Sequence, residues 1–225
     1  MNDLYAVWLV ARKDLLQESR SKAVTVATLF FSAVTLVVIA FAIGQDTRLL
    51  REAAMGALWV ALAFASVISA AQSYQADLED GAFDALLTTP VPRPAVYLGK
   101  LLANWAFMVV LGLVMLPVTI VLYGAEAGPH WPWLIPTIAL GTLGFALIAV
   151  LYAGLTANLR ARESLLPVLM FPVVVPILLA AVRASGALVG IGDLELATGW
   201  LLLLAGFDLV YVVLCTAIYH FVVEE

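Results

Sequence analysis

The stretch QSYQADLEDGAFDALLTTPVPRPAVYLGK, residues 72–100, decides how this chain is organised. It is the one long polar segment of an otherwise apolar sequence, and it carries four acidic residues, three prolines and, towards its end, Arg93 and Lys100. The runs on both sides of it are apolar enough for a membrane. A segment this polar does not suit lipid, and its pattern is more regular than a tether requires. We therefore interpret it as a docking element on the cytoplasmic face, presented to a soluble partner.

The composition is that of a polytopic membrane protein. Of the 225 residues, 64% are hydrophobic and 12% are charged, about half the charge of a typical soluble domain. A helix needs roughly 20 apolar residues to cross a hydrocarbon core about 30 Å thick. Six windows qualify: residues 23–43, 53–71, 101–122, 133–155, 165–182 and 200–222. We expect an all-α fold with six transmembrane helices in one transmembrane domain, residues 1–225. A β-barrel is excluded because these apolar runs do not alternate.

Residues 3–20 have the pattern of an amphipathic helix. Its apolar face carries Leu4, Trp8, Ala11 and Leu15, and its polar face carries Lys13, Gln17 and Arg20. Such a helix lies in the headgroup plane, so we expect an interfacial helix before the first span. The run at 23–43 is too long for a signal peptide, and acids accompany the bases before it, so we expect this span to be retained.

The distribution of Lys and Arg predicts the orientation. With the N-terminus inside, the inner segments hold Arg12, Lys13, Arg20, Lys22, Arg93, Lys100, Arg160 and Arg162, and the outer segments hold Arg48, Arg51 and Arg183. The positive-inside rule therefore places both termini in the cytoplasm.

The central segment divides into a helical part and a turn. Residues 76–88 alternate acids with apolar side chains at helical spacing, and Gly81 costs up to about 1 kcal/mol relative to alanine, which predicts a break or a close approach there. Pro90, Pro92 and Pro94 then stop the helix. The alternative is an ordinary solvated surface helix.

Small residues follow one face of the second span, where Ala54, Ala57, Ala61 and Ala65 recur at helical spacing. Small side chains let helices approach closely in lipid. The stripe indicates either packing within one subunit or an interface between subunits.

The fifth and sixth spans contain the candidates for a transport path. Pro167, Pro172 and Pro176 interrupt the fifth span, which predicts a helix that bends or unwinds against protein or a cavity. Asp208 lies inside the sixth span, and Tyr211 follows on the same face. An acid at that depth is a functional candidate. The alternatives are a kinked structural helix and a carboxyl group that bridges helices.

The chain carries no catalytic or metal-binding motif. Gly99-Lys100 lacks the remaining residues of a Walker A site, and the sequence contains no HExxH, CxxC or GxSxG. His130 and His220 fall on opposite predicted faces of the membrane, so they cannot share a metal ion. We expect no catalytic residues, and ATP-driven transport would need the nucleotide site of another polypeptide.

Two segments carry a resemblance to known families. The acidic and apolar run 78–87, the turn Pro90-Val91-Pro92-Arg93 and the pair Gly99-Lys100 resemble the membrane subunits of type-2 ABC exporters. The fifth-span sequence RESLLPVLMFPVVVP, residues 162–176, closely resembles the haem exporter protein B family (CcmB) of cytochrome c maturation. The N-terminal KDLLQESRSK, residues 13–22, and the chain length also match that family, so the resemblance covers essentially the whole chain.

This resemblance implies a permease in the bacterial inner membrane that works with a CcmA-like ATPase and with CcmC-like and CcmD-like membrane subunits. Haem would be the handled ligand, delivered to a CcmE-like haem chaperone on the outer side. The central segment would contain a coupling helix that inserts in a cleft of the ATPase. Its candidate contact residues are Leu78, Glu79, Asp80, Gly81, Phe83, Asp84, Leu86 and Leu87.

The outer loop before the fourth span offers a candidate haem contact at His130, Trp131 and Trp133. Imidazole is a ligand of haem iron. Aromatic residues at this depth also form the interfacial belt of ordinary membrane proteins. Other functions left open are an ABC permease for another lipophilic substrate, a channel gated by Asp208, and an assembly scaffold without transport.

Overall fold

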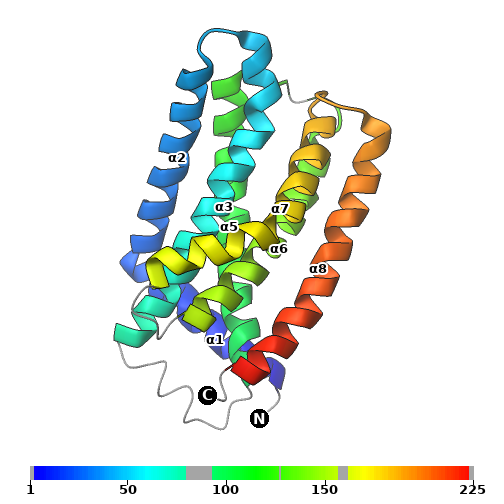
Figure 1. The fold of residues 1–225 in the computed structure, drawn as a ribbon. Coiled ribbons are helices and arrows are strands. Elements are labelled where there is room, and N and C mark those ends of the chain that lie inside the picture. Colours follow the sequence, from blue (N-terminus) through cyan, green and yellow to red (C-terminus); the bar gives the residue numbers. More distant parts are fainter. Residues whose placement is uncertain (1–2, 80–92, 127, 157–161, 223–225) are drawn as a thin grey trace.

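The computed structural model describes residues 3–79, 93–126, 128–156 and 162–222 (Figure 1). These residues form long helices joined by short connections. The elements are α1 (Asp3–Ser21), α2 (Ala23–Ile43), α3 (Thr47–Glu79), α5 (Arg93–Tyr123), the 3-10 turn η1 (Trp131–Trp133), α6 (Leu134–Thr156), α7 (Arg162–Leu188) and α8 (Leu194–Val222). Among the described residues, six helices are long and apolar enough to cross a membrane. The prediction of an all-α multi-pass membrane protein is confirmed.

The helices around the central segment are longer than the predicted spans. α3 continues eight residues past position 71, and α5 begins at Arg93 rather than at position 101. The first four residues of the helix predicted at 76–88 are therefore the last turn of α3. The rest of that helix, residues 80–88, and the proline turn up to Pro92 lie outside the described residues.

One end of the bundle gathers several chain segments that are distant in sequence. Helix α1, the last turn of α3, the first turn of α5 and the last turn of α8 all lie at the lower end of Figure 1. Following the orientation expected from the distribution of Lys and Arg, we call this the inner end, and we call the opposite one, with the connections after α2, α5 and α7, the outer end. Side-chain caps help to begin helices at the outer end: Asp46 Oδ1 accepts bonds from the backbone N–H groups of Arg48 (3.0 Å) and Leu49 (3.1 Å).

Helices α3 and α6 form the centre of the bundle. In the most apolar window of each, 72% of the residues are buried, against 17% in α2 and α8, which present large apolar side chains outward. Gly141 of α6 lies so close to Trp59 of α3 that an added Cβ would stand 2.4 Å from the indole ring. Trp59 is fully buried, and its Nε1 donates to Ser185 Oγ of α7 (2.9 Å).

The small-residue stripe of α3 packs within the chain. Ala54, Ala57, Ala61 and Ala65 are all buried in the contact of α3 with its neighbours. Of the two interpretations of this stripe, packing within one subunit is the one that the structure supports. Small side chains let α5, α6 and α7 approach a single central helix.

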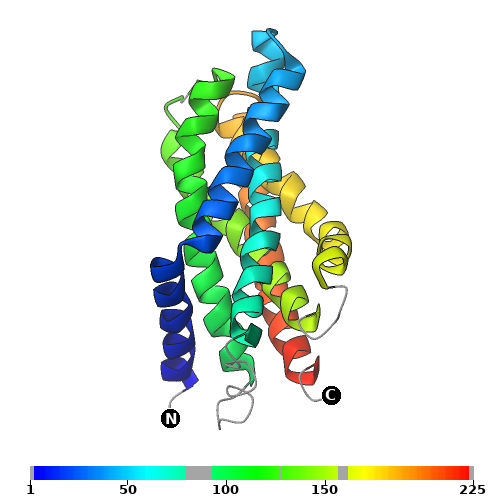
Figure 2. The ribbon, with the colours of Figure 1, turned by 90° about the vertical axis from the view of Figure 1, so that its left-hand side faces the viewer.

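The proline-rich helix α7 is bent rather than unwound. It remains α-helical through Pro167, Pro172 and Pro176. Its first half runs obliquely across the bundle and its second half turns toward the outer end (Figures 1 and 2). Each of these prolines removes one backbone N–H donor, and its ring clashes with the carbonyl four residues earlier, which explains the change of direction.

Candidate functional site

Four charged side chains meet at the inner end, and we call them the inner charge cluster: Lys13, Asp14, Asp77 and Lys100. Lys100 Nζ of α5 lies 2.7 Å from Asp77 Oδ2 of α3 and 3.2 Å from Asp14 Oδ2 of α1. Lys13 Nζ of α1 lies 3.0 Å from Asp14 Oδ1 and also contacts Asp77 Oδ1. Two cations and two carboxylates thus tie three helices together.

Neutral groups of α3 complete the coordination of Lys100. Its ammonium group lies 3.0 Å from Ser73 Oγ and 4.6 Å from the centre of the Tyr74 ring, a cation–π distance. Ser73 Oγ in turn donates to Asp14 Oδ2 (3.1 Å). The ammonium group is therefore surrounded by acceptors, as a buried charge requires.

Glycine before Lys100 lets α1 reach the cluster. A Cβ built on Gly99 would lie 2.6 Å from Val10 Cβ and 2.9 Å from the carbonyl oxygen of Val7. Helices α1 and α5 therefore touch at backbone distance at this residue. The pair Gly99-Lys100 has two roles one residue apart, because the glycine admits α1 and the lysine binds Asp14 on it.

The charges of the cluster balance within the protein. Lys100 and Asp77 are each only 1% exposed, and Asp14 is 10% exposed. Partial burial lowers the pKa of Lys13, but the carboxylates of Asp14 and Asp77 outweigh this effect and raise the pKa above its ordinary value, which favours the charged form of the amine. A buried pair of this kind is strongly disrupted when one partner is removed, because the other charge remains unpaired.

The inner charge cluster was not predicted from the sequence. The sequence places Lys13 on the polar face of the first helix and Asp77 among the acids of the polar central segment. The expectation that Asp77 is solvated is wrong, because Asp77 is buried and the amine of Lys13 contacts its carboxylate. The sequence contains one feature that agrees with this cluster. Lys13 and Asp14 are adjacent opposite charges in the first helix, and Lys100 is a single basic residue that directly follows Gly99.

The predicted coupling residues lie beside this cluster where they are described. Leu78 is half-buried against the core, and Glu79 is exposed and accepts a bond from Gln75 Nε2 (2.8 Å). Asp80, Gly81, Phe83, Asp84, Leu86 and Leu87 lie outside the described residues. Asp77 and Lys100 flank the segment 80–92 from the two helices that enter and leave it.

The predicted path residue Asp208 is buried in the middle of the bundle. Helix α8 begins six residues earlier than predicted, and Asp208 is about 21 Å from the start of the helix at 1.5 Å per residue. Its carboxyl group is 3% exposed and has no hydrogen-bond partner among the described residues. It lies against Gly144 of α6, where an added Cβ would be 2.7 Å from Oδ1 and equally close to Ile177 of α7.

Some of the other candidates for the transport path lie near Asp208, and others do not. Tyr211, one turn further along α8, donates to the carbonyl oxygen of Val173 on α7 (3.2 Å). Pro176 precedes Ile177, which contacts the same glycine as Asp208, whereas Pro172 is exposed on the surface of α7. The structure therefore brings Asp208, Tyr211 and the second half of α7 together.

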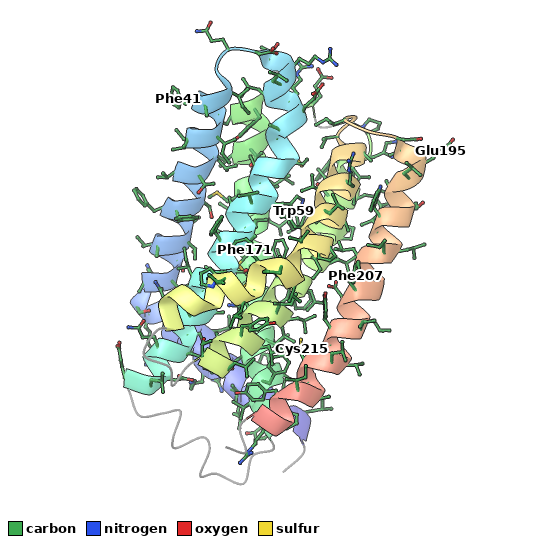
Figure 3. All side chains as sticks on the ribbon, in the orientation of Figure 1. Phe41, Trp59, Phe171, Glu195, Phe207 and Cys215 are labelled. Carbon is green, nitrogen blue, oxygen red and sulfur yellow. The ribbon has the colours of Figure 1, made fainter. Side chains whose placement is uncertain are left out.

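The outer candidates His130, Trp131 and Trp133 lie far from both groups. All three are exposed around η1, Trp131 by 51% and Trp133 by 57%. Figure 3 shows Glu195 at this outer end of α8 and Cys215 towards the inner end, with Trp59 between these levels. Exposed indoles at a bundle end are typical of an aromatic belt. Among the described residues, no three His, Cys, Asp or Glu side chains are grouped to hold a metal ion.

Comparison with known proteins identifies the family. A family model described as "CcmB protein" matches residues 5–223. Proteins named "Heme exporter protein B" are similar along most of their length. The one from Pseudomonas aeruginosa is 29% identical over 188 residues, 84% of this chain and 82% of that protein. The one from Paracoccus denitrificans is 31% identical over 175 residues (76% and 78%), and the one from Rhodobacter capsulatus 32% over 151 residues (67% and 69%).

The sequence resemblance at positions 162–176 and the match over nearly the whole chain agree with each other and with a bundle of six membrane-crossing helices. The chain belongs to the CcmB protein family.

Proposed function

We propose that this chain is the permease subunit of an ABC transporter that exports haem or delivers it to a haem chaperone in cytochrome c biogenesis. The observation that carries the proposal is the family match over residues 5–223, together with relatives named as haem exporters. ATP is hydrolysed in a separate CcmA-like subunit. CcmC-like and CcmD-like membrane subunits and a CcmE-like chaperone complete the system in the bacterial inner membrane.

The ATPase docks on the segment between α3 and α5. The exposed Glu79 begins this contact, and Asp80, Gly81, Phe83, Asp84, Leu86 and Leu87 continue it. Support comes from the inner charge cluster, because a force on this segment acts on Asp77 at one end and on Lys100 at the other. Both residues bind α1, so the three helices move together.

Haem would be handled on the outer side of a path formed by α7 and α8. The bend of α7 and the buried carboxyl group of Asp208 against Gly144 support this part of the proposal. His130, Trp131 and Trp133 are the candidate residues for a haem contact at the outer end.

The docking proposal is tested by charge reversal. Glu79→Lys together with Asp84→Lys should abolish co-purification of the ATPase with the chain, while the yield of folded chain in detergent stays at the wild-type level. The matched control reverses two exposed acids at the outer end, Glu52→Lys with Glu195→Lys, and should keep the ATPase bound. Wild-type recovery of the ATPase with the inner double variant would refute the docking site.

Orientation is tested with a single added cysteine. The chain's own Cys215 is buried, so Asp84→Cys can be labelled selectively. A membrane-impermeant maleimide should react with it in inverted vesicles and not in intact cells. Labelling from outside intact cells would place the central segment on the wrong side for an ATPase.

The substrate is tested by measuring how much haem the chaperone carries in cells with and without this chain. Loss of haem loading without the chain supports haem as the substrate, and unchanged loading supports another lipophilic molecule.

A further inference from the structure

A cavity of about 380 Å³ lies at the inner end between α1, α2, α3 and α5. It is lined by residues near the start of α2, near the end of the predicted span 53–71 and near the start of the predicted span 101–122. Three membrane crossings therefore meet the aqueous boundary at the level of this cavity. The region where lipid headgroups join acyl chains is at this level.

Two residues that line the cavity carry buried side-chain carbonyl oxygens that lack hydrogen-bond donors among the described residues. Asn104 of α5 is 6% exposed, and its Nδ2 donates to Ser69 Oγ (2.8 Å), while its Oδ1 accepts no bond from any residue that the structure describes. Gln72 Oε1 of α3 is also buried and also accepts no hydrogen bond from any described residue. Both residues line the cavity. A buried carbonyl oxygen without a donor is costly, so a ligand with N–H groups would stabilise this arrangement.

The charged side chains that line the cavity, within the described part of the chain, are the acids Asp14, Glu18 and Glu79. Asp14 is neutralised by Lys13 and Lys100. Among the described contacts, Glu18 accepts bonds from the backbone N–H (2.7 Å) and the hydroxyl group of Thr25, and Glu79 accepts one from the Gln75 amide (2.8 Å), so both carboxylates have only neutral donors. The lining thus favours a cationic group. It disfavours haem, whose two carboxylates would be repelled.

The cavity wall also has an apolar part, beside the polar side chains of Gln17, Ser21, Ser69, Ser73 and Gln75. Leu15, Val24 and Phe107 line it, and Leu15 is 37% exposed. The ligand therefore has an apolar part as well as a cationic head. Lys22, which follows the lining residue Ser21 in the sequence, is exposed and is therefore available to a phosphate group.

We propose that this cavity binds a phospholipid with a primary ammonium headgroup, of the phosphatidylethanolamine type. Its ammonium group donates to Asn104 and Gln72 beside the carboxylates, and its chains follow the apolar wall into the bilayer. A choline headgroup has the same charge and no N–H to donate, so it should be rejected. This inference stands on the cavity alone and does not depend on haem being the substrate.

Native mass spectrometry of the full-length chain tests the proposal. The protein is offered equal amounts of ethanolamine, choline and glycerol phospholipids with identical acyl chains. We expect about a tenfold preference for the ethanolamine lipid over the choline lipid, because a charged donor is lost in the latter. Equal retention of the two lipids would overturn the proposal. Glycerophosphoethanolamine, which has no acyl chains, should not be retained, and its retention would show that the site takes a free amine instead.

Two variants connect the preference to the cavity. Asn104→Leu and Gln72→Leu should each remove it, and Gln72 is only partly buried, so its variant is expected to fold even where the first does not. The matched control is Thr119→Val, another buried polar residue of α5, which bonds its own backbone at Met115 (2.9 Å) outside the cavity. Wild-type preference in Gln72→Leu would refute the site. So would loss of the lipid when the chain is purified together with its ATPase, because a protein would then fill the cavity.

Discussion

Lys100 and Asp77 face each other across the start of α5 and the end of α3, with Nζ 2.7 Å from Oδ2 and each side chain 1% exposed. They stand at the two ends of the segment 80–92, and each also contacts α1. In the proposed transporter, this pair joins the ATPase-docking segment to the N-terminal helix. A buried ion pair contributes little net stability to a fold, so we interpret this pair as fixing the relative position of α3 and α5.

Removing one charge of this pair should destabilise the protein strongly. Lys100→Met leaves Asp77 buried with only Lys13 as a cationic partner and leaves Asp14 with less compensation, so we expect a loss of about 3 kcal/mol or more. Thermal or denaturant unfolding of the detergent-solubilised chain measures this change.

The matched control is the exposed pair at the outer end. Arg48 Nε lies 2.9 Å from Glu52 Oε1 in a solvated i,i+4 arrangement, so Arg48→Met should cost less than about 1 kcal/mol. The double variant Asp77→Leu with Lys100→Met should recover part of the loss of the single variant. Equal effects of Lys100→Met and Arg48→Met would contradict the buried network.

A side chain at Gly99 should detach α1. Its Cβ would lie 2.6 Å from Val10 Cβ, and the backbone of Val7 leaves no room to move aside, so Gly99→Val is expected to open the α1–α5 contact. The readout is limited trypsin digestion after Arg12, Lys13 and Arg20, which should become faster in the variant. Gly56→Val, with nothing within 4 Å of its Cβ, is the control and should leave the digestion unchanged.

The contact of α3 with α6 should be equally sensitive. Gly141→Ala places a methyl group 2.4 Å from the fully buried Trp59 ring, and we expect it to cost about 1–3 kcal/mol. Gly206→Ala on α8 meets nothing within 4 Å and should be neutral or stabilise by up to about 1 kcal/mol, because alanine favours the helix. The unfolding temperatures of the two variants in the same detergent show which variant is less stable, and we expect this to be Gly141→Ala.

Neutralising Asp208 separates the transport mechanisms. Asp208→Asn keeps the shape of a side chain that is buried against Gly144, so the bundle should stay folded. If a separate subunit hydrolyses ATP, the complex with Asp208→Asn should keep its ATPase activity. If Asp208 contributes to the transport path, the variant should load the chaperone with haem more slowly. A channel gated by this acid would instead lose ion conduction in a planar bilayer. Loss of ATPase activity with an intact fold would contradict the separation of path and motor.

Much of the fold could be predicted because lipid restricts the choices. A run of about 20 apolar residues without charges can only be a helix there, which explains why the span at 23–43 agrees with α2 to the residue. The ends of α3, α5 and α8 were less predictable, since polar residues that extend a helix into water resemble those of a loop. The bend of α7 was foreseen from its three prolines, whose effect on a helix is local.

The candidate site was only partly predictable. Asp208 stood out because an acid within a span is costly wherever it points. Asp77 did not, because an acid at a span end is usually solvated, and its burial depends on α1 folding back against α5 and on Lys100 arriving from another helix. Asp77 differs from the exposed Glu79, two residues later, only through its contacts with distant residues. Lys13 is 64 positions away and Lys100 is 23 positions away.

The amino-acid sequence by itself determined the six membrane-crossing helices of the described residues and the family, since these depend on local hydrophobicity and on a continuous motif. The tertiary structure decided which charges are buried, which helices are central and where the cavity between α1, α2, α3 and α5 opens. The physical reason is that the burial of a charge depends on partners brought from distant segments, and no local pattern specifies those partners.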